Sequence, residues 1–239
     1  MEYRELPLPP SLDGQVAAIW TMRHKGAVSD WIEHVATPDG CVEAILRLAG
    51  RSAWLREQPV CFATGLGKQP IRFGFSGDAE FLAVKLWPWA WEALGGAPCP
   101  SFANDWIPLD ESHALHRLLS CDANTLVDRL EASLAGRYDV IGTALLTVNS
   151  VAQLRARTDL EARALQRWFT RHIGMSPRDY LRVLRFRDTL RALPQDEVKL
   201  ADVAAARGYA DQAHMARDFR AMAGTAPRRV RKRAKGPFL

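Results

Sequence analysis

Arginine and glutamine side chains recur in two segments of the chain that lie fifty residues apart. The candidates are Arg163, Gln166, Arg167 and Arg171 in the first segment, and Gln212, Ala213, Ala216 and Arg217 in the second. An arginine can donate two hydrogen bonds at once to guanine, and a glutamine can pair with adenine in the same bidentate way. We therefore interpret both segments as surfaces for reading base edges in double-stranded DNA. A solvated helix face is the competing interpretation for each residue.

The two segments belong to an internal repeat, which is a strong sign of duplicated structural units. Arg167 and Phe169 match Arg217 and Phe219, and residues 174–178 match residues 224–228. Because the two arginines hold the same place in both copies, an ion pair within each unit is a competing role for them.

Each copy is predicted to contain a short helix, a tight turn and a second helix. The first unit covers residues 151–156 and 161–172, and the second covers residues 200–207 and 211–222. Gly208 suits the turn and Asp211 is a good cap for the helix that follows. The expected core residues are Leu154, Leu165, Phe169, Leu200, Val203, Met215 and Phe219.

A long helix is predicted between the two units. Ser176 is a serine cap, Pro177 takes the first helical position, and Asp179 lies three residues past the cap. The helix is expected to end near Leu193, before Pro194, at roughly 18 residues and about 27 Å. It would hold the two units apart as a rigid spacer.

Charge is distributed unevenly along the chain. Residues 151–239 contain 20 basic and 9 acidic residues, a net charge of +11, whereas residues 1–150 carry −6. This asymmetry favours contact with a polyanion through the C-terminal half alone. We expect residues 151–239, expressed alone, to form a soluble helical domain whose affinity for duplex DNA falls steeply with salt.

The first hundred residues have the alternating pattern of short strands. Strands are expected at 16–22, 31–35, 41–48, 71–75 and 81–86, the last two as a hairpin across Ser76-Gly77-Asp78. A short helix should follow from Trp87-Pro88 to Gly95. The pattern predicts a small sheet or barrel. Five tryptophans would either pack in its core or line an apolar pocket: Trp20, Trp31, Trp87, Trp89 and Trp91.

Leucines at helical spacing mark the region between the halves. They are Leu115, Leu118, Leu119, Leu126, Leu130 and Leu134. This spacing predicts one or two amphipathic helices. Two uses of the apolar face stay open, packing against the chain's own domain and pairing of two chains in a homodimer.

Residues 150–231 resemble the DNA-binding domain of the AraC/XylS family of regulators. The matching runs are LQRWF at 165–169, GMSPRDYL at 174–181, AAARGYADQAHMARDF at 204–219, and the ending at 224–227. The resemblance implies a sequence-specific transcription regulator whose two helix-turn-helix subdomains enter successive major grooves of duplex DNA. It places Arg163, Gln166 and Arg167 of the first segment, and Gln212, Ala213, Ala216 and Arg217 of the second, on the groove-facing positions. RNA polymerase is a further expected partner.

More weakly, the N-terminal half is similar to the β-rich sensor domains of this family. That resemblance implies a cupin-like or partial-barrel fold and control by a small effector, whose binding residues it leaves unknown. The whole chain is then an α+β protein with a β-rich domain at 1–109, a helical linker at 110–141 and a tandem helix-turn-helix domain at 142–239.

Four residues depart from the family pattern. Arg155 stands where alanine is usual, Asp159 where glycine is usual, and Glu161 where a serine cap is usual. An arginine at a packed position must reach water or a partner, and a glutamate sits badly near a phosphate. Val230 replaces a tyrosine in the second unit. The three departures in the first unit therefore argue against base contact by that unit.

The spacing of the cysteines and histidines predicts neither a metal site nor a catalytic thiol. Cys41, Cys61, Cys99 and Cys121 show no metal-ligand spacing, and His24 and His34 are isolated, so we expect neither metal nor cofactor. A DNA-repair alkyl acceptor sharing this DNA-binding unit is the enzymatic alternative. It needs a cysteine with basic neighbours or a metal, and the sequence shows neither, so we expect no enzyme.

Two further expectations concern partners and location. The N-terminal half is open to a protein partner in place of an effector. No apolar run approaches the ~18–20 residues that cross a bilayer, and the first residues do not resemble a signal sequence. We therefore expect a cytoplasmic protein without membrane contact.

Overall fold

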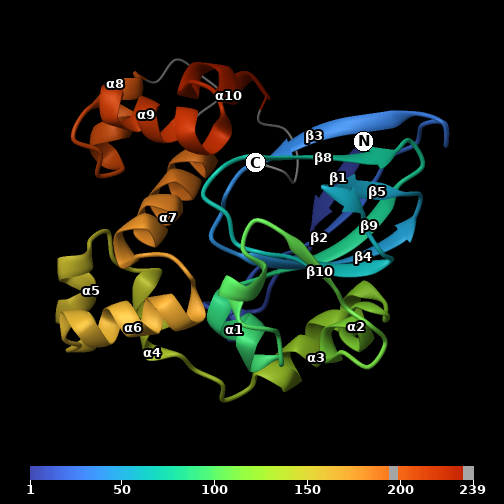
Figure 1. Cartoon of the computed structure of the whole chain (residues 1–239), viewed down its shortest axis with the longest axis horizontal. Helices are drawn as coiled ribbons and strands as arrows, with labels where there is room; N and C mark the ends of the chain where they lie inside the picture. The colour runs from blue at the N-terminus through green and yellow to red at the C-terminus, as the bar shows by residue number, and fades with distance from the viewer. Residues whose placement is uncertain (194–198, 234–239) are drawn as a thin grey trace.

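The strands of the N-terminal half form two antiparallel sheets that face each other (Figure 1). The computed structural model describes residues 1–193 and 199–233. The strands are β1 (Glu2–Glu5), β2 (Val16–Arg23), β3 (Trp31–Ala36), β4 (Val42–Ala49), β5 (Ser52–Trp54), β6 (Arg56–Glu57), β7 (Cys61–Thr64), β8 (Ile71–Ser76), β9 (Glu80–Leu86) and β10 (Trp106–Pro108). The larger sheet has the order β1-β2-β9-β4-β7-β10, and the smaller has the order β3-β8-β5-β6. All five predicted strands are present.

The predicted hairpin across Ser76-Gly77-Asp78 is wrong. Strand β8 pairs with β3 and β5, whereas β9 pairs with β2 and β4. The turn instead carries the chain from one sheet to the other. Phe75 and Phe81 consequently meet between the sheets, with ring centroids 5.9 Å apart. Burial of these two aromatic rings decides the strand pairing, which a local turn signal cannot reveal.

Side chains of the larger sheet alternate between two covered faces. On β9, Phe81 and Ala83 face the smaller sheet, while Val84 and Leu86 face the helices. The same alternation points Lys85 toward the smaller sheet. Its register partner on β4 is Glu43, so two charged residues lie side by side on an otherwise apolar inner face.

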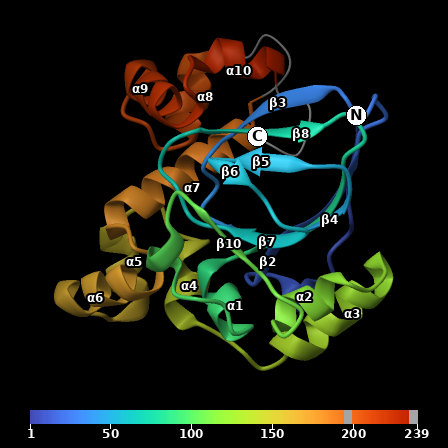
Figure 2. The same cartoon turned by 45° about the vertical axis from the view of Figure 1, so that its right-hand side comes forward.

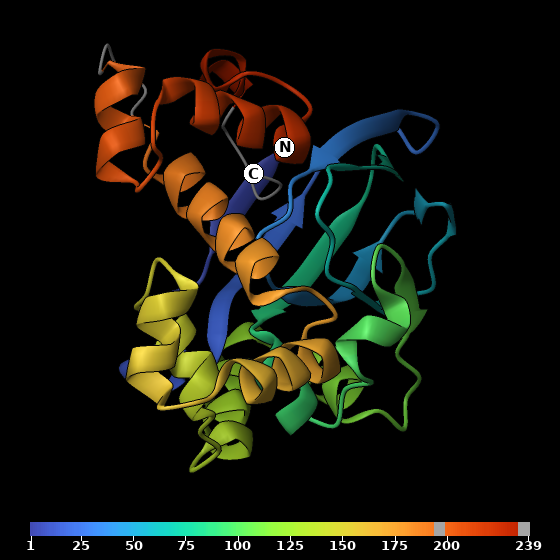
Figure 3. The ribbon, with the colours of Figure 1, turned by 60° about the vertical axis from the view of Figure 1, so that its left-hand side comes forward.

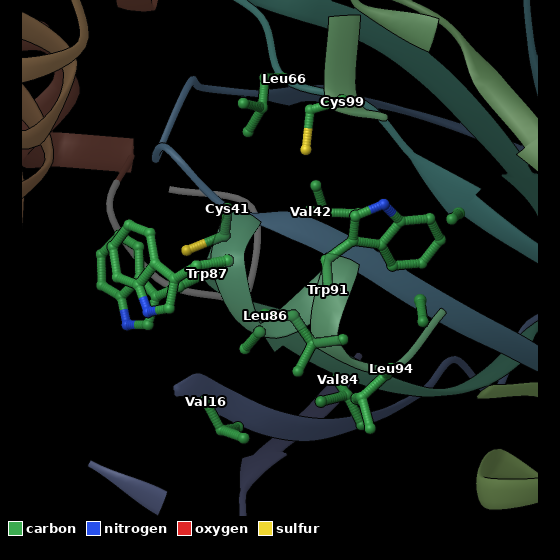
Figure 4. Close-up of a cluster of buried hydrophobic side chains, with 14 of the residues drawn as sticks. Val16, Cys41, Val42, Leu66, Val84, Leu86, Trp87, Trp91, Leu94 and Cys99 are labelled. Atoms are coloured by element: carbon green, nitrogen blue, oxygen red, sulfur yellow. The ribbon is translucent and has the colours of Figure 1, made fainter. Parts of the chain in front are cut away.

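Helices cover the outer face of the larger sheet (Figure 2). They are α1 (Pro88–Ala93), α2 (Ala114–Leu119) and α3 (Ala123–Leu134), with short 3-10 turns η1 (Pro10–Leu12) and η2 (Cys99–Phe102). Figure 4 shows Trp91 and Leu94 from the α1 region beside Val84 and Leu86 of β9. The six predicted leucines of α2 and α3 are buried in this core. They therefore pack within the chain, and a homodimer would have to use another surface.

The C-terminal half is helical and consists of two units at the two ends of α7 (Figure 3). Its helices are α4 (Val140–Leu145), α5 (Val151–Thr158), α6 (Ala162–His172), α7 (Pro177–Arg191), α8 (Leu200–Ala206), α9 (Gln212–Ala223) and α10 (Pro227–Arg233). The predicted helices of both units are confirmed. The spacer helix is present with 15 residues, and Pro194 lies outside the described residues. In the described part of the chain no helix is long and apolar enough to cross a membrane.

Candidate nucleic-acid interface

The first candidate surface lies along α6. Its four predicted residues, Arg163, Gln166, Arg167 and Arg171, are all exposed. Leu165 and Phe169 lie on the opposite side of the helix and are buried. Residues three and four apart share one face of a helix. Helix α6 therefore presents three cations and one amide to solvent along a single face.

The second candidate surface lies along α9. Gln212, Ala213 and Arg217 are exposed, and Ala216 is half-buried. Met215 and Phe219 anchor the helix from the other side and are completely buried. The side chains of the two alanines are short. A neighbouring molecule can therefore approach the helix backbone between Gln212 and Arg217.

Short-range sequence signals fix where these helices begin. The Asp211 carboxylate accepts a hydrogen bond from the backbone N–H of His214 at 2.5 Å, as a helix cap does. Gly208 has φ of 70° in the turn before it, and Asp159 has φ of 52° at the equivalent turn of the first unit. Aspartate enters this left-handed region more readily than most residues. The departure from glycine at Asp159 therefore preserves the turn.

The other departures are also accommodated. Arg155 is exposed, and its guanidinium lies 3.5 Å from the carboxylate of Glu161 and 3.4 Å from the backbone oxygen of Leu160. Both charged groups thus reach solvent, and the core of the first unit is intact. Val230 is buried in the core of the second unit.

The ion pair that the sequence suggested for Arg167 and Arg217 is made by other arginines. Asp218 is 3% exposed at its side chain, and it accepts hydrogen bonds from Arg182 at 2.7 Å and from Arg185 at 3.3 Å. Within the described residues no ion pair involves Arg167 or Arg217. These two arginines are therefore available to an external partner.

A groove of about 740 Å³ separates the two units beside α7. Its basic and polar lining includes Ser150, Arg178, Arg182, Arg185, His214 and Arg217. Such a lining is suited to a phosphate backbone, which takes most of the hydrogen bonds in protein–DNA contacts. Arg178, Arg182 and Arg185 were not among the residues predicted from the sequence to contact DNA. Their spacing of four and three residues on a predicted helix was the available signal.

The first unit is docked on the N-terminal half. His172 at the end of α6 contacts Glu92 of α1, with Nδ1 and Oε2 2.5 Å apart. Gly174 lies against Pro100 of η2. One continuous apolar core joins the first unit to the helices under the sheet. Since the docked residues lie at the end of α6, its exposed face stays free.

The inner space between the two sheets holds the residues of a second candidate site. Of the five predicted tryptophans, Trp20 lines a cavity there together with Trp54, which the sequence analysis did not single out. Trp87, Trp89 and Trp91 are buried in the core. Trp31 is 48% exposed. The pocket interpretation therefore holds for Trp20 alone among the five.

The cysteines are poorly placed for nucleophilic chemistry. Burial raises the pKa of Cys61 to about 12, and it raises the pKa values of Cys41 and Cys99 still further. The expectation that no basic residue lies near a cysteine is wrong for Cys41, which is close to Arg187 and Lys85. Burial outweighs both cations. Across residues 1–193 and 199–233, no group of three or more His, Cys, Asp or Glu is placed to hold a metal ion.

Two family models match the chain. A model described as a helix-turn-helix domain matches residues 154–233. A model described as a domain of unknown function, DUF6597, matches residues 4–108.

Two curated relatives match about a third of the chain. The HTH-type transcriptional activator RhaS of Pectobacterium carotovorum subsp. carotovorum (strain PC1) is 35% identical over 81 residues, which are 34% of this chain and 29% of that protein. RhaS of Pectobacterium atrosepticum is 35% identical over 75 residues, or 31% and 27%. The chain therefore spans less than a third of the length of these relatives.

Solved structures share the fold over nearly the whole chain. ToxT from Vibrio cholerae O395 bound to (E)-4-(8-methylnaphthalen-1-yl)but-3-enoic acid has a TM-score of 0.52 at 9% identity, covering 97% of this chain and 99% of that one. The P21 crystal form of ToxT has a TM-score of 0.50 at 9% identity, covering 99% and 100%. At this identity the likeness concerns the fold alone.

A β-rich domain followed by two helix-turn-helix units on one spacer helix defines a class of two-domain helix-turn-helix proteins. Within that class, the helix-turn-helix match over residues 154–233 and the RhaS relatives support the resemblance of the C-terminal region to the AraC/XylS family.

Proposed function

We propose that this protein is a sequence-specific transcription regulator that binds double-stranded DNA. The observation that carries the proposal is the pair of matching faces on α6 and α9, whose arginine and glutamine side chains are exposed and not engaged in ion pairs among the described residues. Each helix would enter a major groove, and the arginine-lined groove between them would follow the intervening phosphates. RNA polymerase and a second copy of the chain stay predicted partners.

The proposal includes control by a small effector bound in the N-terminal half. The loop formed by residues 38–41 lines the cavity between the sheets and also contacts α7. The Tyr180 hydroxyl of α7 donates a hydrogen bond to the Gly40 oxygen at 2.8 Å. A molecule that displaces this loop would therefore act directly on the helix that sets the two units apart. That a ToxT structure contains a small organic acid supports an effector of small-molecule size.

We further propose the division into a sensor domain at 1–109, a helical linker at 110–141 and a DNA-binding domain at 142–239. The alkyl-acceptor alternative has little support, because the buried thiols have raised pKa values. A protein partner for the N-terminal half stays the main competitor to an effector.

Selection of bound sequences from random duplex DNA tests the central proposal with the full chain. We expect one enriched motif whose affinity falls steeply as salt rises, because bound phosphates release counterions. The double variant Arg167→Ala, Arg217→Ala should lose the motif. The matched control Arg51→Ala, Arg56→Ala removes the same charge from exposed residues of the N-terminal half and should retain it. Failure to enrich any sequence over the starting pool would contradict the proposal.

A further inference from the structure

Two adjoining cavities lie between the sheets, and residues of β4 and β9 line both of them or one of them. One has a mixed polar and apolar lining and a volume of about 60 Å³, and the other is largely apolar, with a volume of about 50 Å³. They share the lining residues Ala36, Glu43, Trp54, Thr64 and Ile71. A water-sized group needs about 10–15 Å³ of such volume. The two cavities together therefore have room for roughly seven to eleven such groups.

The apolar cavity is built like a site for a flat, aromatic body. Trp20, Trp54, Phe62 and Phe81 line it. Ser52 also lines it, and its hydroxyl is buried without a hydrogen-bond partner among the described residues. A buried polar group without a partner is costly. An unsatisfied hydroxyl at this place is accordingly typical of a site that accepts a ligand.

Negative charge predominates at the junction of the cavities. Lys85 Nζ lies 2.7 Å from Asp39 Oδ2 and 3.2 Å from Glu43 Oε1, so one ammonium faces two carboxylates. Asp39 also accepts a hydrogen bond from the backbone N–H of Cys41 at 2.9 Å. The nearby Arg187 is itself paired with Asp188. Of the two carboxylates, Glu43 is therefore the less compensated.

The directions of the pKa shifts agree with this geometry. Burial opposes ionisation of both carboxyl groups, but Lys85 and the hydrogen bonds bring the pKa of Asp39 below its usual value. For Glu43 burial prevails, and its pKa is raised. Both hydrogen bonds that the described residues make to Glu43, from Trp20 Nε1 and Lys85, end on Oε1. Oε2 is left for a further donor from the cavities that Glu43 lines.

We propose that these cavities bind a small aromatic amine, with its ammonium group at Glu43 and its ring between Trp20, Trp54 and the two phenylalanines. The cation would supply the charge that Glu43 lacks and would lie against tryptophan rings, which attract cations. An anion of the same size would meet two carboxylates and find Lys85 already engaged. This inference rests on the proposed effector control and names the chemical class of the effector.

Calorimetric titration of the full chain with three probes of similar shape tests the charge preference. The probes are 2-phenylethylamine, 2-phenylethanol and phenylacetate at neutral pH. We expect saturable binding of the amine, at least about tenfold tighter than the alcohol because of one charge-assisted hydrogen bond, and no binding of the acid. Binding of the acid or the alcohol as tightly as the amine would overturn the proposal, as would the absence of saturation with the amine.

Two variants locate the site. Glu43→Gln keeps the shape of the side chain and should abolish the preference for amine over alcohol. Ser52→Val fills part of the apolar cavity and should weaken both probes. The control Glu33→Gln changes an exposed carboxylate of β3 and should alter neither affinity. Circular dichroism confirms the fold of each variant. Amine binding that is unaffected by both cavity variants would refute the site.

These measurements need no DNA. A chain that binds the amine but enriches no DNA motif would retain the cavity proposal and lose the regulatory one. A chain that enriches a motif but fails the three-probe titration would retain the regulatory proposal and lose the cavity proposal.

Discussion

Arg217 and Asp218 are neighbours in sequence on α9, yet they differ in burial. Arg217 is exposed, whereas Asp218 is buried against Arg182 and Arg185 of α7. The fixed carboxylate orients α9 on the spacer helix, and the free guanidinium is left on the surface that would meet DNA. Asp218 carries one negative charge against the two α7 arginines, so the groove that they line stays basic.

At the level of single residues, we predict that Gln212→Ala and Arg217→Ala each relax base preference at one position of the bound site. A bidentate contact contributes about 1–3 kcal/mol of discrimination. Fluorescence anisotropy with the selected site and its single-base-pair substitutions measures the effect. Arg51→Ala removes an equal charge from an exposed residue of the N-terminal half and should leave the preference unchanged. An equal loss of affinity for every sequence would instead identify a phosphate contact.

We also predict that Glu43→Gln stabilises the protein at neutral pH. Since burial raises the folded-state pKa of Glu43 above its unfolded-state value, this residue destabilises the fold increasingly as the pH rises above the unfolded-state pKa, and fully once the pH exceeds the folded-state pKa. The neutral glutamine lacks this cost. Below about pH 4 the carboxyl is protonated in both states, so the difference should vanish there. Thermal melts at several pH values measure the stability difference between variant and parent. Each kcal/mol shifts the melting temperature by roughly 2–4 °C for a chain of this size. A variant less stable than the parent at pH 8 would contradict the prediction.

At the scale of elements, residue periodicity predicted the individual strands and helices. It did not predict which strands pair when they lie far apart in the sequence. The strands, the helix caps at Ser176 and Asp211, and the buried leucines followed from spacing and residue type. The hairpin failed because Phe75 and Phe81 find their contacts across two sheets. A lone lysine within the apolar run 81–86 was a signal for the interior site. Its two carboxylate partners lie on other segments, which only the fold brings together.

The contact between the loop at 38–41 and α7 supports a prediction at this scale. Tyr180→Phe removes the hydroxyl that donates to the Gly40 oxygen and leaves the ring in place. Because the abandoned carbonyl is buried, we expect a loss of about 1–3 kcal/mol in unfolding free energy. Denaturant unfolding measures it. Tyr138→Phe removes the same atom from an exposed ring and should have no effect. Equal stability of both variants would show that the contact contributes nothing.

At the scale of the whole molecule, the first helix-turn-helix unit and the sensor-like half share one core. Ile173, Met175 and Leu184 pack in the same cluster as Trp87 and Trp91. The second unit has a separate core of its own, built around Phe186 and Phe219. The two units are therefore alike in sequence but differ in what stabilises them.

This shared core changes the expectation for residues 151–239 expressed alone. Separation from the N-terminal half would expose the apolar side chains of the first unit. We now predict that the fragment aggregates or melts in two steps, with the second unit as its more stable part. Calorimetry and hydrogen exchange can resolve the steps. A single cooperative transition in a monomeric fragment would restore the original expectation of an independent soluble domain.

The last prediction joins the two proposed sites. An amine bound at Glu43 would lie beside the loop at 38–41, which contacts Tyr180 and Leu184 of α7. We predict that 2-phenylethylamine changes affinity for the selected DNA site. Because such coupling is reciprocal, the DNA must change affinity for the amine by the same factor. Coupling of about 1–3 kcal/mol corresponds to roughly 5–150-fold.

Titration of the amine with and without the DNA site measures this factor from both directions. Tyr180→Phe should reduce it, because the variant lacks the bond that joins the loop to the helix. Tyr138→Phe should leave it intact. Equal amine affinities in both titrations would exclude equilibrium control of DNA binding by this ligand. Regulation would then have to act after binding, through contact with polymerase, and the shared core would serve only to hold the first unit in place.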